Sequence, residues 1–392
     1  MQIIAQDLAD TDFYTYTMGQ MIFNQFPNAI VKYKYKNRTK NYQFRAGFAD
    51  ELKEQIELMS DLRMRKQMIQ FFSEKTPWLK PTYLQWLANC FTFKPEQVKI
   101  FQTGGELDIE IVGPWFETVF WEEPLLYTIT ELSHTDPKTG KMMVKVSDWK
   151  DRIRQKAERL SEAGVNWIDF GTRRRFSFEV QDNVCDIMRS FKPLFRGTSN
   201  PFLAQKYNIP VFGTFAHQLP MALQASYGLQ QCNIRAMEHW LQEYRGDLGI
   251  ALLDTTTTPK FLEIFDSFYA RLFDGVRQDS GNPKEIGDMV IKHYEKLRID
   301  PTTKVLVLSD SLNVDKAIEL HNYFKGRIRT TMGIGTHITN DVGYTPINHV
   351  IKLVAADFGQ GMKDVVKISD DNGKAMGGSQ DAIDIAKRVL DL

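Results

Sequence analysis

Cysteine is scarce in this chain of 392 residues, which contains only Cys90, Cys185 and Cys232. Their spacing matches no zinc motif and suggests no disulfide framework. A sparse, odd set is typical of a reducing compartment, where buried cysteines remain free thiols. We therefore expect a cytoplasmic protein without a structural zinc site.

An excess of charge is also missing, because 49 Lys and Arg residues balance 49 Asp and Glu residues. This balance argues against a broad nucleic-acid footprint or a polybasic membrane contact. No apolar run approaches the roughly 18–20 residues of a membrane span. The first ten residues lack the basic start and apolar centre of a signal peptide. We expect a soluble protein that binds neither nucleic acid nor membranes, although local arginine clusters could bind small anions.

Two catalytic signatures are absent as well. The P-loop pattern G-x-x-x-x-G-K-[ST] does not occur, so any ATP is held in another way. No predicted strand ends in a lysine placed to form a Schiff base, which argues against a phosphosugar aldolase or isomerase.

The length of the chain favours two domains. In the first part, residues 30–35 and 107–112 alternate like half-buried strands, and 51–59 has one apolar helical face. Residues 115–132 form an aromatic and aliphatic run with Pro124 inside, which predicts a buried helix or a kinked pair. The turn-rich stretch 134–141 is a plausible domain boundary.

After this boundary, short apolar segments are each followed by a polar loop that carries Gly or Asp. About seven such units occur, at 167–170, 194–195, 211–212, 249–253, 276, 305–308 and 330–332. Helical patterns separate several of them, which predicts an α/β barrel with its chemistry on loops after the strands. Near the end, 351–354 and 365–368 suggest a hairpin, and a short helix begins at Asp381.

The loop Gly333-Ile334-Gly335-Thr336 is a candidate phosphate site. Glycines at a strand end let backbone N–H groups converge on an anion, and a Thr hydroxyl adds a donor. The pattern alone equally marks a tight turn. Its late position in a barrel, where phosphate sites recur, favours phosphate binding.

Arginines supply a second candidate. Arg173, Arg174 and Arg175 are consecutive, and neighbouring side chains of an extended chain point to opposite faces. At least one of them is therefore expected in a surface salt bridge, while the others could clamp a phosphate or pyrophosphate. Arg277, two residues before Asp279, resembles a ligand-binding residue at a strand end.

A lone histidine is more often structural than catalytic, but His217 follows a strand and a Gly-Thr pair among anion-binding loops. A neutral imidazole there could act as a base or as a nucleophile toward a phosphoryl group. Asp254, Asp279 and Asp310 each end a predicted strand. Beside phosphates they suggest Mg²⁺, and the alternative is helix capping.

Seven motifs in order resemble the nicotinate phosphoribosyltransferase family over about residues 10–368. They are Asp10–Tyr14, Gly113–Trp115 with Glu123–Leu126, Asp169–Phe176, Gly197–Asn200, Gly213–His217, Arg277–Gly281 and Gly333–Thr336. The resemblance implies an irregular α/β barrel of about seven strands at residues 136–349. It also implies an open α/β sandwich domain made of residues 1–135 and joined by 350–392.

The resemblance implies an ATP-dependent ligase that forms nicotinate mononucleotide from nicotinate and 5-phosphoribosyl 1-pyrophosphate, the first step of NAD salvage from nicotinate. It implies ATP as a co-substrate, Mg²⁺ as a cofactor, and a homodimer with shared active sites. Metal ligands cannot be assigned from the sequence.

By motif, His217 resembles the histidine that ATP phosphorylates in this family. The residues that resemble the nicotinate contacts are Thr214, Arg277 and Tyr14, and Tyr14 could come from the same subunit or from the partner. The resemblance implies that the ribose 5-phosphate is bound by Gly333, Gly335 and Thr336. It implies that the other phosphates are bound by Arg173 and Arg174, and that Asp279 and Ser280 lie near the ribose or the metal. Two positions depart from the pattern. Gln218 replaces a common Glu, which leaves the partner that orients His217 open, and Asn282 replaces a common Asp.

Two rival functions remain. One is an enzyme of the same fold that uses nicotinamide or quinolinate, and quinolinate would call for more basic residues in the pocket. The other is a catalytically silent regulator that carries a phosphohistidine. The intact set Tyr14, His217, Arg277 and Thr336 argues against silence.

Overall fold

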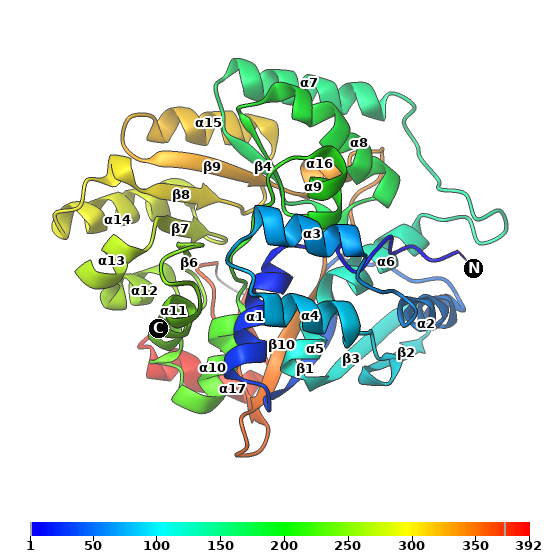
Figure 1. Ribbon diagram of the computed structural model, residues 1–392, viewed down its shortest axis with the longest axis horizontal. Coiled ribbons are helices and arrows are strands. Elements are labelled where there is room, and N and C mark those ends of the chain that lie inside the picture. Colours follow the sequence, from blue (N-terminus) through cyan, green and yellow to red (C-terminus); the bar gives the residue numbers. More distant parts are fainter. Residues whose placement is uncertain (1, 372–373) are drawn as a thin grey trace.

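Two large β-sheets organise the molecule, which a computed structural model describes for residues 2–371 and 374–392 (Figure 1). The first is antiparallel, in the order β11-β10-β1-β3-β2, with strands β1 Ile30–Asn37, β2 Val98–Thr103, β3 Glu106–Pro114, β10 His349–Asp357 and β11 Lys363–Asp364. The second is parallel, in the order β5-β4-β9-β8-β7-β6. Its strands are β4 Trp167–Asp169, β5 Phe195–Thr198, β6 Ile250–Leu252, β7 Gly275–Gln278, β8 Val305–Leu308 and β9 Arg329–Ile334.

The antiparallel sheet follows the predicted alternation. Val31, Tyr33 and Tyr35 of β1 are buried, and Lys34 between them is exposed. β1 pairs with β3 on one side and with β10 on the other. A strand from the C-terminal part of the chain thus completes the sheet of the N-terminal part. The domain boundaries at 135/136 and 349/350 stay a prediction.

Residues 115–132 form a kinked pair, one of the two predicted alternatives. Helix α5 spans Trp115–Thr118 and α6 spans Glu122–Ser133. Pro124 lies in the first turn of α6, where a missing N–H leaves no helical hydrogen bond unmade. The other helices of the N-terminal part are α1 Tyr14–Gln25, α2 Phe48–Met59, α3 Lys66–Lys75 and α4 Pro81–Asn89, with a 3₁₀ turn at Pro95–Gln97.

The helices of residues 149–339 accompany the strands of the parallel sheet, as in an α/β barrel, and α10 among them packs on β10 of the antiparallel sheet. They are α7 Trp149–Glu162, α8 Phe178–Met188, α9 Pro201–Tyr207, α10 Gln218–Tyr227, α11 Cys232–Tyr244, α12 Thr258–Ile264, α13 Ser267–Leu272, α14 Pro283–Lys296, α15 Val314–Phe324 and α16 Thr336–Thr339. Short 3₁₀ turns lie at Thr172–Arg174, Arg189–Phe191 and Pro301–Thr303. None of the helices in the described ranges is long and apolar enough to cross a bilayer.

Six of the seven predicted barrel segments form strands, and the prediction is wrong for residues 211–212. Val211 instead makes an isolated parallel bridge to Thr198. The segment starts after Pro210, which has no N–H for a ladder, and stops at Gly213 with φ +159°. The barrel is therefore open between β5 and β6, an irregular α/β barrel as expected.

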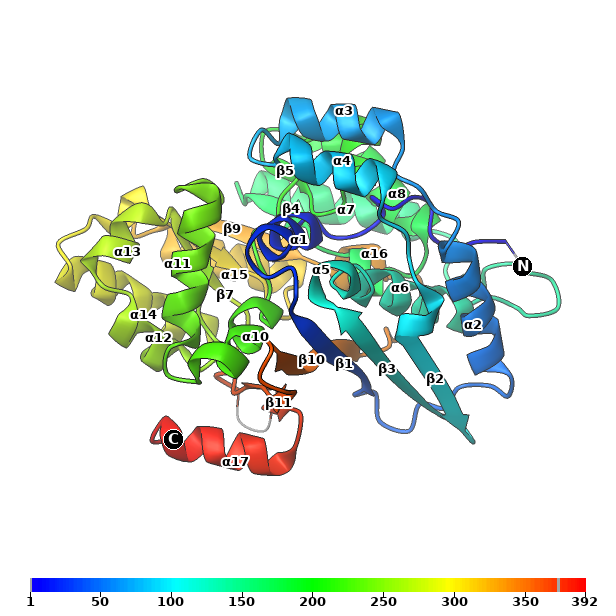
Figure 2. The ribbon, with the colours of Figure 1, turned by 60° about the horizontal axis from the view of Figure 1, so that its bottom comes forward.

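The predicted C-terminal hairpin is only partly correct. β11 pairs with β10, and the Val365 amide donates to the Val354 carbonyl at 3.0 Å. The chain then turns away, so that β12 (Val366–Lys367) pairs with β13 (Met376–Gly377) instead. Helix α17 (Gln380–Val389) follows at the edge of the molecule, below β10 and β11 in Figure 2.

Candidate active site

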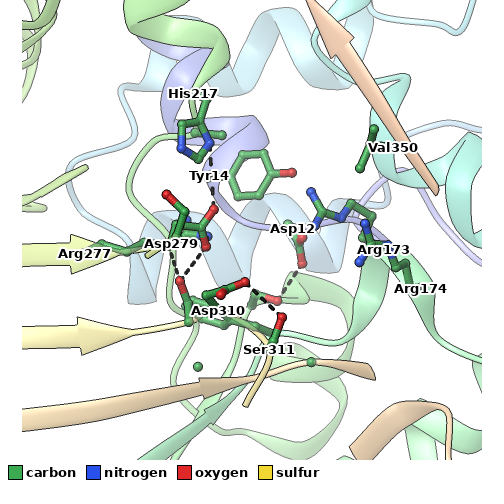
Figure 3. A pocket seen from close by; sticks show the side chains of 18 of the residues that line it. Asp12, Tyr14, Arg173, Arg174, His217, Arg277, Asp279, Asp310, Ser311 and Val350 are labelled. Carbon is green, nitrogen blue, oxygen red and sulfur yellow. Dashed lines mark hydrogen bonds and ion pairs between the residues drawn. The ribbon is translucent and has the colours of Figure 1, made fainter. Parts of the chain in front are cut away.

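One cavity of about 370 Å³ lies where the parallel strands end, and β10 and the start of α1 close it (Figure 3). Every residue predicted for the site lines it: Tyr14, Arg173, Arg174, Thr214, His217, Arg277, Asp279, Ser280, Gly333, Gly335 and Thr336. The motifs therefore meet in one place, although the role of each residue stays a prediction.

His217 stands at the start of α10, and Asp254 orients its ring. Imidazole Nε2 lies 2.9 Å from Asp254 Oδ1, just after β6. Lys367 Nζ lies 2.7 Å from Asp254 Oδ2, and Ser280 Oγ donates to the same oxygen at 2.5 Å. Burial opposes ionisation of Asp254, but Lys367 and His217 outweigh it and hold its pKa well below the usual range. An ionised carboxylate only accepts hydrogen bonds, so Nε2 carries the ring proton.

The other ring nitrogen, Nδ1, faces the cavity. It lies 3.9 Å from Asp279 Oδ2, and no described residue makes a closer polar contact that would consume its lone pair. Burial lowers the pKa of His217 most, the charge of Lys367 lowers it too, and Asp254 and Asp279 oppose them, which together leaves the pKa at about 4. The imidazole is therefore neutral near pH 7, with a free lone pair that can act as a nucleophile or a base.

Gln218, one of the two residues that depart from the family pattern, does not orient His217. Its Oε1 accepts hydrogen bonds from Tyr33 Oη at 2.7 Å and from Trp115 Nε1 at 3.3 Å. It thus ties the start of α10 to the antiparallel sheet. Sequence reasoning missed the orienting role of Asp254, which it treated only as a metal ligand or a helix cap.

Arg277 is fixed through two of its nitrogens. Nη2 lies 2.8 Å from Asp279 Oδ1, and Nε donates to Ser309 Oγ at 2.8 Å. Burial opposes ionisation of Asp279, but Arg277 and His217 keep its pKa well below the usual range. These contacts hold the guanidinium plane, and Nη1 is the nitrogen that can take a carboxylate ligand. Ser309 was not singled out from the sequence.

The expectation of a surface salt bridge among the three arginines is wrong. Arg175 is fully buried and binds both carboxylate oxygens of Asp10, at 2.5 and 2.7 Å. Arg173 Nη1 lies 3.5 Å from Glu122, and Arg174 Nε donates to the His349 carbonyl at 2.9 Å. Residues Thr172–Arg174 form a 3₁₀ turn, so the alternation of an extended strand does not apply.

The cavity wall carries more positive charge than its carboxylates offset. Burial, together with the nearby charges of Arg173 and Arg38, lowers the pKa of Arg174 to about 9. Burial also lowers the pKa of Lys352, which shares Glu122 with Arg173 at 3.3 Å. Crowded cations of this kind favour a bound anion. Four basic lining residues were missed from the sequence because they lie outside the barrel loops: Arg38, Lys352, Lys367 and Lys374.

Two glycines of the site are required by close approaches. A Cβ on Gly333 would lie 2.6 Å from the Phe170 ring, so this glycine serves packing of the wall besides any anion. A Cβ on Gly213 would lie 2.7 Å from the Tyr14 amide nitrogen. The approach lets the loop after Val211 dock on α1, where Thr17 Oγ1 donates to the Thr214 carbonyl at 2.5 Å.

Tyr14 is supplied to the cavity by the same chain that supplies His217. Its ring lies between His217 and Arg173 in Figure 3. A partner subunit is not needed to bring this residue to the site.

The described residues contain no cluster of three or more His, Cys, Asp or Glu side chains that could hold a metal. Asp254 and Asp279 are already paired with cationic groups. Asp310 accepts a hydrogen bond from Ser311 Oγ at 3.0 Å, and burial raises its pKa. Mg²⁺ takes one or two carboxylates and relies on phosphates and waters for the rest. Asp310 fits that demand.

Comparisons with known proteins agree with this geometry. The model of the nicotinate phosphoribosyltransferase (NAPRTase) family matches residues 165–392, and that of its N-terminal domain matches 9–130. The chain is 40% identical over 387 residues to nicotinate phosphoribosyltransferase of Chromohalobacter salexigens, covering 98% of each. It is 37% identical over 405 residues to that of Methanosarcina mazei, covering 98% of each.

Solved structures give the same result. The crystal structure of nicotinate phosphoribosyltransferase from Porphyromonas gingivalis superimposes with a TM-score of 0.94 at 35% identity, covering 98% of this chain and 99% of that one. The Vibrio cholerae structure gives a TM-score of 0.91 at 33% identity, covering 100% and 94%.

Proposed function

Because the chain belongs to the nicotinate phosphoribosyltransferase family, we propose that it forms nicotinate mononucleotide from nicotinate and 5-phosphoribosyl 1-pyrophosphate, the first step of NAD salvage from nicotinate. We further propose that ATP hydrolysis drives this reaction through a phosphohistidine at His217. One observation carries the proposal: a neutral imidazole with a free Nδ1 shares a cavity with Arg277 and a cluster of crowded cations.

Nicotinate binds between Tyr14 and Arg277 in this proposal. Arg277 Nη1 takes the carboxylate, since Asp279 and Ser309 already hold the other side of the guanidinium. Thr214 Oγ1 donates to the Ile250 carbonyl at 3.1 Å, which orders this edge of the pocket. A bidentate or charge-assisted contact of this kind contributes about 1.5–3 kcal/mol and distinguishes an acid from an amide.

The phosphates bind on both sides of the ribose. Gly333, Gly335 and Thr336 hold the 5-phosphate, and Arg173 and Arg174 hold the pyrophosphate. Asp279 and Ser280 lie near the ribose hydroxyls. When bound, Mg²⁺ supplies positive charge to the departing pyrophosphate, and Asp310 is the carboxylate of this chain that would hold it.

In the transfer step the pyridine nitrogen attacks C1 of the ribose, and the bond from C1 to the pyrophosphate oxygen breaks. The developing negative charge on the leaving group is stabilised by Arg173 and Arg174, while Arg277 aligns the nicotinate ring. No covalent bond to the protein forms in this step, so positioning and charge stabilisation provide the rate enhancement.

In the coupling step Nδ1 of His217 attacks the γ-phosphorus of ATP and ADP leaves. The ring then carries a positive charge, which Asp254 stabilises through Nε2. The phosphoenzyme binds phosphoribosyl pyrophosphate more tightly, and hydrolysis to free phosphate releases the product. Each tenfold change in affinity needs only about 1.4 kcal/mol.

The decisive assay mixes the protein with nicotinate, phosphoribosyl pyrophosphate and Mg²⁺, with and without ATP, and follows mononucleotide formation. His217→Ala should abolish stimulation by ATP and retain some transfer without ATP. Full ATP stimulation in that variant would exclude the phosphohistidine.

The rivals are tested with the same assay. Nicotinamide and quinolinate should be poor substrates beside nicotinate, and Arg277→Gln should reduce the preference for the acid over the amide. A silent regulator would form the phosphoenzyme but no mononucleotide from any of the three substrates.

A further inference from the structure

We propose that Lys367 is a positioning residue that holds Asp254 as an ionised acceptor and so fixes His217 with the Nδ1 lone pair toward the cavity. The inference rests on the proposed nucleophilic role of His217. It assigns a task to the C-terminal segment, whose strand β12 lies outside the barrel that bears His217 and Asp254.

The contacts of Lys367 support this role. Its Nζ lies 2.7 Å from Asp254 Oδ2, the oxygen that does not face His217. Its side chain is 13% exposed, and that of Asp254 is 1% exposed. A buried carboxylate stays ionised only when cations and donors offset its lost hydration. Lys367 is the cation that contacts Asp254 from the side opposite the imidazole.

The backbone on each side of Lys367 is fixed by the elements that carry His217 and Asp254. Gln224 of α10 accepts from the Val366 amide at 2.9 Å and donates to its carbonyl at 2.7 Å. The Ile368 amide donates to the Thr255 carbonyl at 2.8 Å, one residue after Asp254. The strand that carries Lys367 is thus bonded both to the helix that follows His217 and to the residue that follows Asp254.

Helix α17, at the edge of the molecule in Figure 2, packs against this strand. Ala386 and Leu390 lie with Val366 and Ile368 in a small buried cluster of their own. The Asp370 amide donates to Ser280 Oγ at 3.0 Å, and Ser280 is the third donor to Asp254. The C-terminal segment therefore positions Lys367 and Ser280 beside Asp254, the hydrogen-bond partner of His217.

The charges that face His217 come from several elements. Asp254 and Asp279 follow β6 and β7, Arg277 lies on β7, and Lys367 comes from β12, while Tyr14 of α1 lines the same cavity. Loss of Lys367 leaves two carboxylates beside the imidazole with one cation fewer, which favours imidazolium. Imidazolium has no lone pair, so phosphorylation should require a higher pH.

The test is Lys367→Met, with Lys367→Arg as the rescue variant. Lys363→Met is the matched control, since it removes an exposed lysine of the same segment that bonds to the Ala225 carbonyl and Gln360 and not to the site. The pKa of His217 is measured by NMR titration of labelled histidine in the full protein without substrates. Phosphoenzyme formation from labelled ATP is measured from pH 5 to 8.

Lys367→Met should raise the pKa of His217 by about 1–3 units. It should also shift the acidic limb of the pH profile of phosphoenzyme formation to higher pH by the same number of units. Arginine should restore both, and the Lys363 variant should change neither. Gln224→Ala, which loosens the strand without changing charge, should shift the pKa in the same direction and serves if the methionine variant fails to fold.

An unchanged pKa of His217 in both Lys367→Met and Gln224→Ala would overturn the inference. A loss of affinity for phosphoribosyl pyrophosphate with an unchanged pKa would instead make Lys367 a direct ligand of substrate. If wild-type protein forms no phosphoenzyme, the proposed function fails, and the titration still decides the role of Lys367.

Discussion

Replacing Asp254 by Asn tests how strongly one carboxylate controls the histidine. Two donors, Lys367 Nζ and Ser280 Oγ, converge on Oδ2, and His217 Nε2 is the partner of Oδ1. The amide oxygen of the introduced asparagine should therefore take the Oδ2 position and leave its NH₂ group facing the imidazole. That group donates to Nε2, so the ring proton moves to Nδ1 and the lone pair leaves the cavity.

The size of the effect follows from these contacts. The reactive tautomer has its proton on Nε2, so recovering it requires the NH₂ group of the asparagine to turn toward Lys367 and Ser280. The amide oxygen then loses its hydrogen bond from the charged Lys367, at a cost of about 1.5–3 kcal/mol. Since about 1.4 kcal/mol is a factor of ten, the reactive population should fall between about 10- and 150-fold. Phosphoenzyme formation should fall by the same factor, while transfer without ATP should change less.

The assay is a single-turnover measurement of label transferred from [γ-³²P]ATP to protein, with Asp315→Asn as control. Asp315 has a 76% exposed side chain on α15, so the same chemical change there should leave the rate unaltered. A wild-type rate in the Asp254 variant, with ¹⁵N shifts that still place the proton on Nε2, would refute the reasoning.

Three further predictions concern stability, pH and assembly. Arg175→Met leaves Asp10 buried without its cation, so the free energy of unfolding from urea denaturation should fall by about 3–5 kcal/mol; a loss below about 1 kcal/mol would contradict this. Burial raises the pKa of Glu123 to about 8, above the unfolded value of 4.5. The contribution of this group to the free energy of unfolding is therefore complete below the unfolded pKa. It is lost as the pH rises toward 8, at roughly 1.4 kcal/mol per pH unit. Glu123→Gln should flatten that pH dependence in thermal melts, and equal slopes in both proteins would be the contrary result. Mixing Tyr14→Ala with His217→Ala should restore no ATP-stimulated activity, because each chain supplies its own Tyr14; recovery on mixing would demonstrate the shared site of a homodimer.

Local patterns were enough to predict most strands of the barrel and a candidate set of site residues. The alternation in β1 and the loops after β4, β7 and β9 follow from side-chain periodicity and from the backbone freedom of glycine. These signals lie within a few residues of one another. The sequence therefore determined the α/β class, the order of the elements and the candidate set around His217 and Arg277.

The partnerships across the chain were decided by the tertiary structure alone. Asp254 lies 37 residues from His217, and Lys367 reaches Asp254 from a strand that follows the whole barrel. The 3₁₀ turn that buries Arg175 against Asp10, 165 residues away, likewise leaves no periodic trace. The choice of which charged groups face each other depends on packing between distant segments. That packing lowers the pKa of His217 and keeps its imidazole neutral near pH 7.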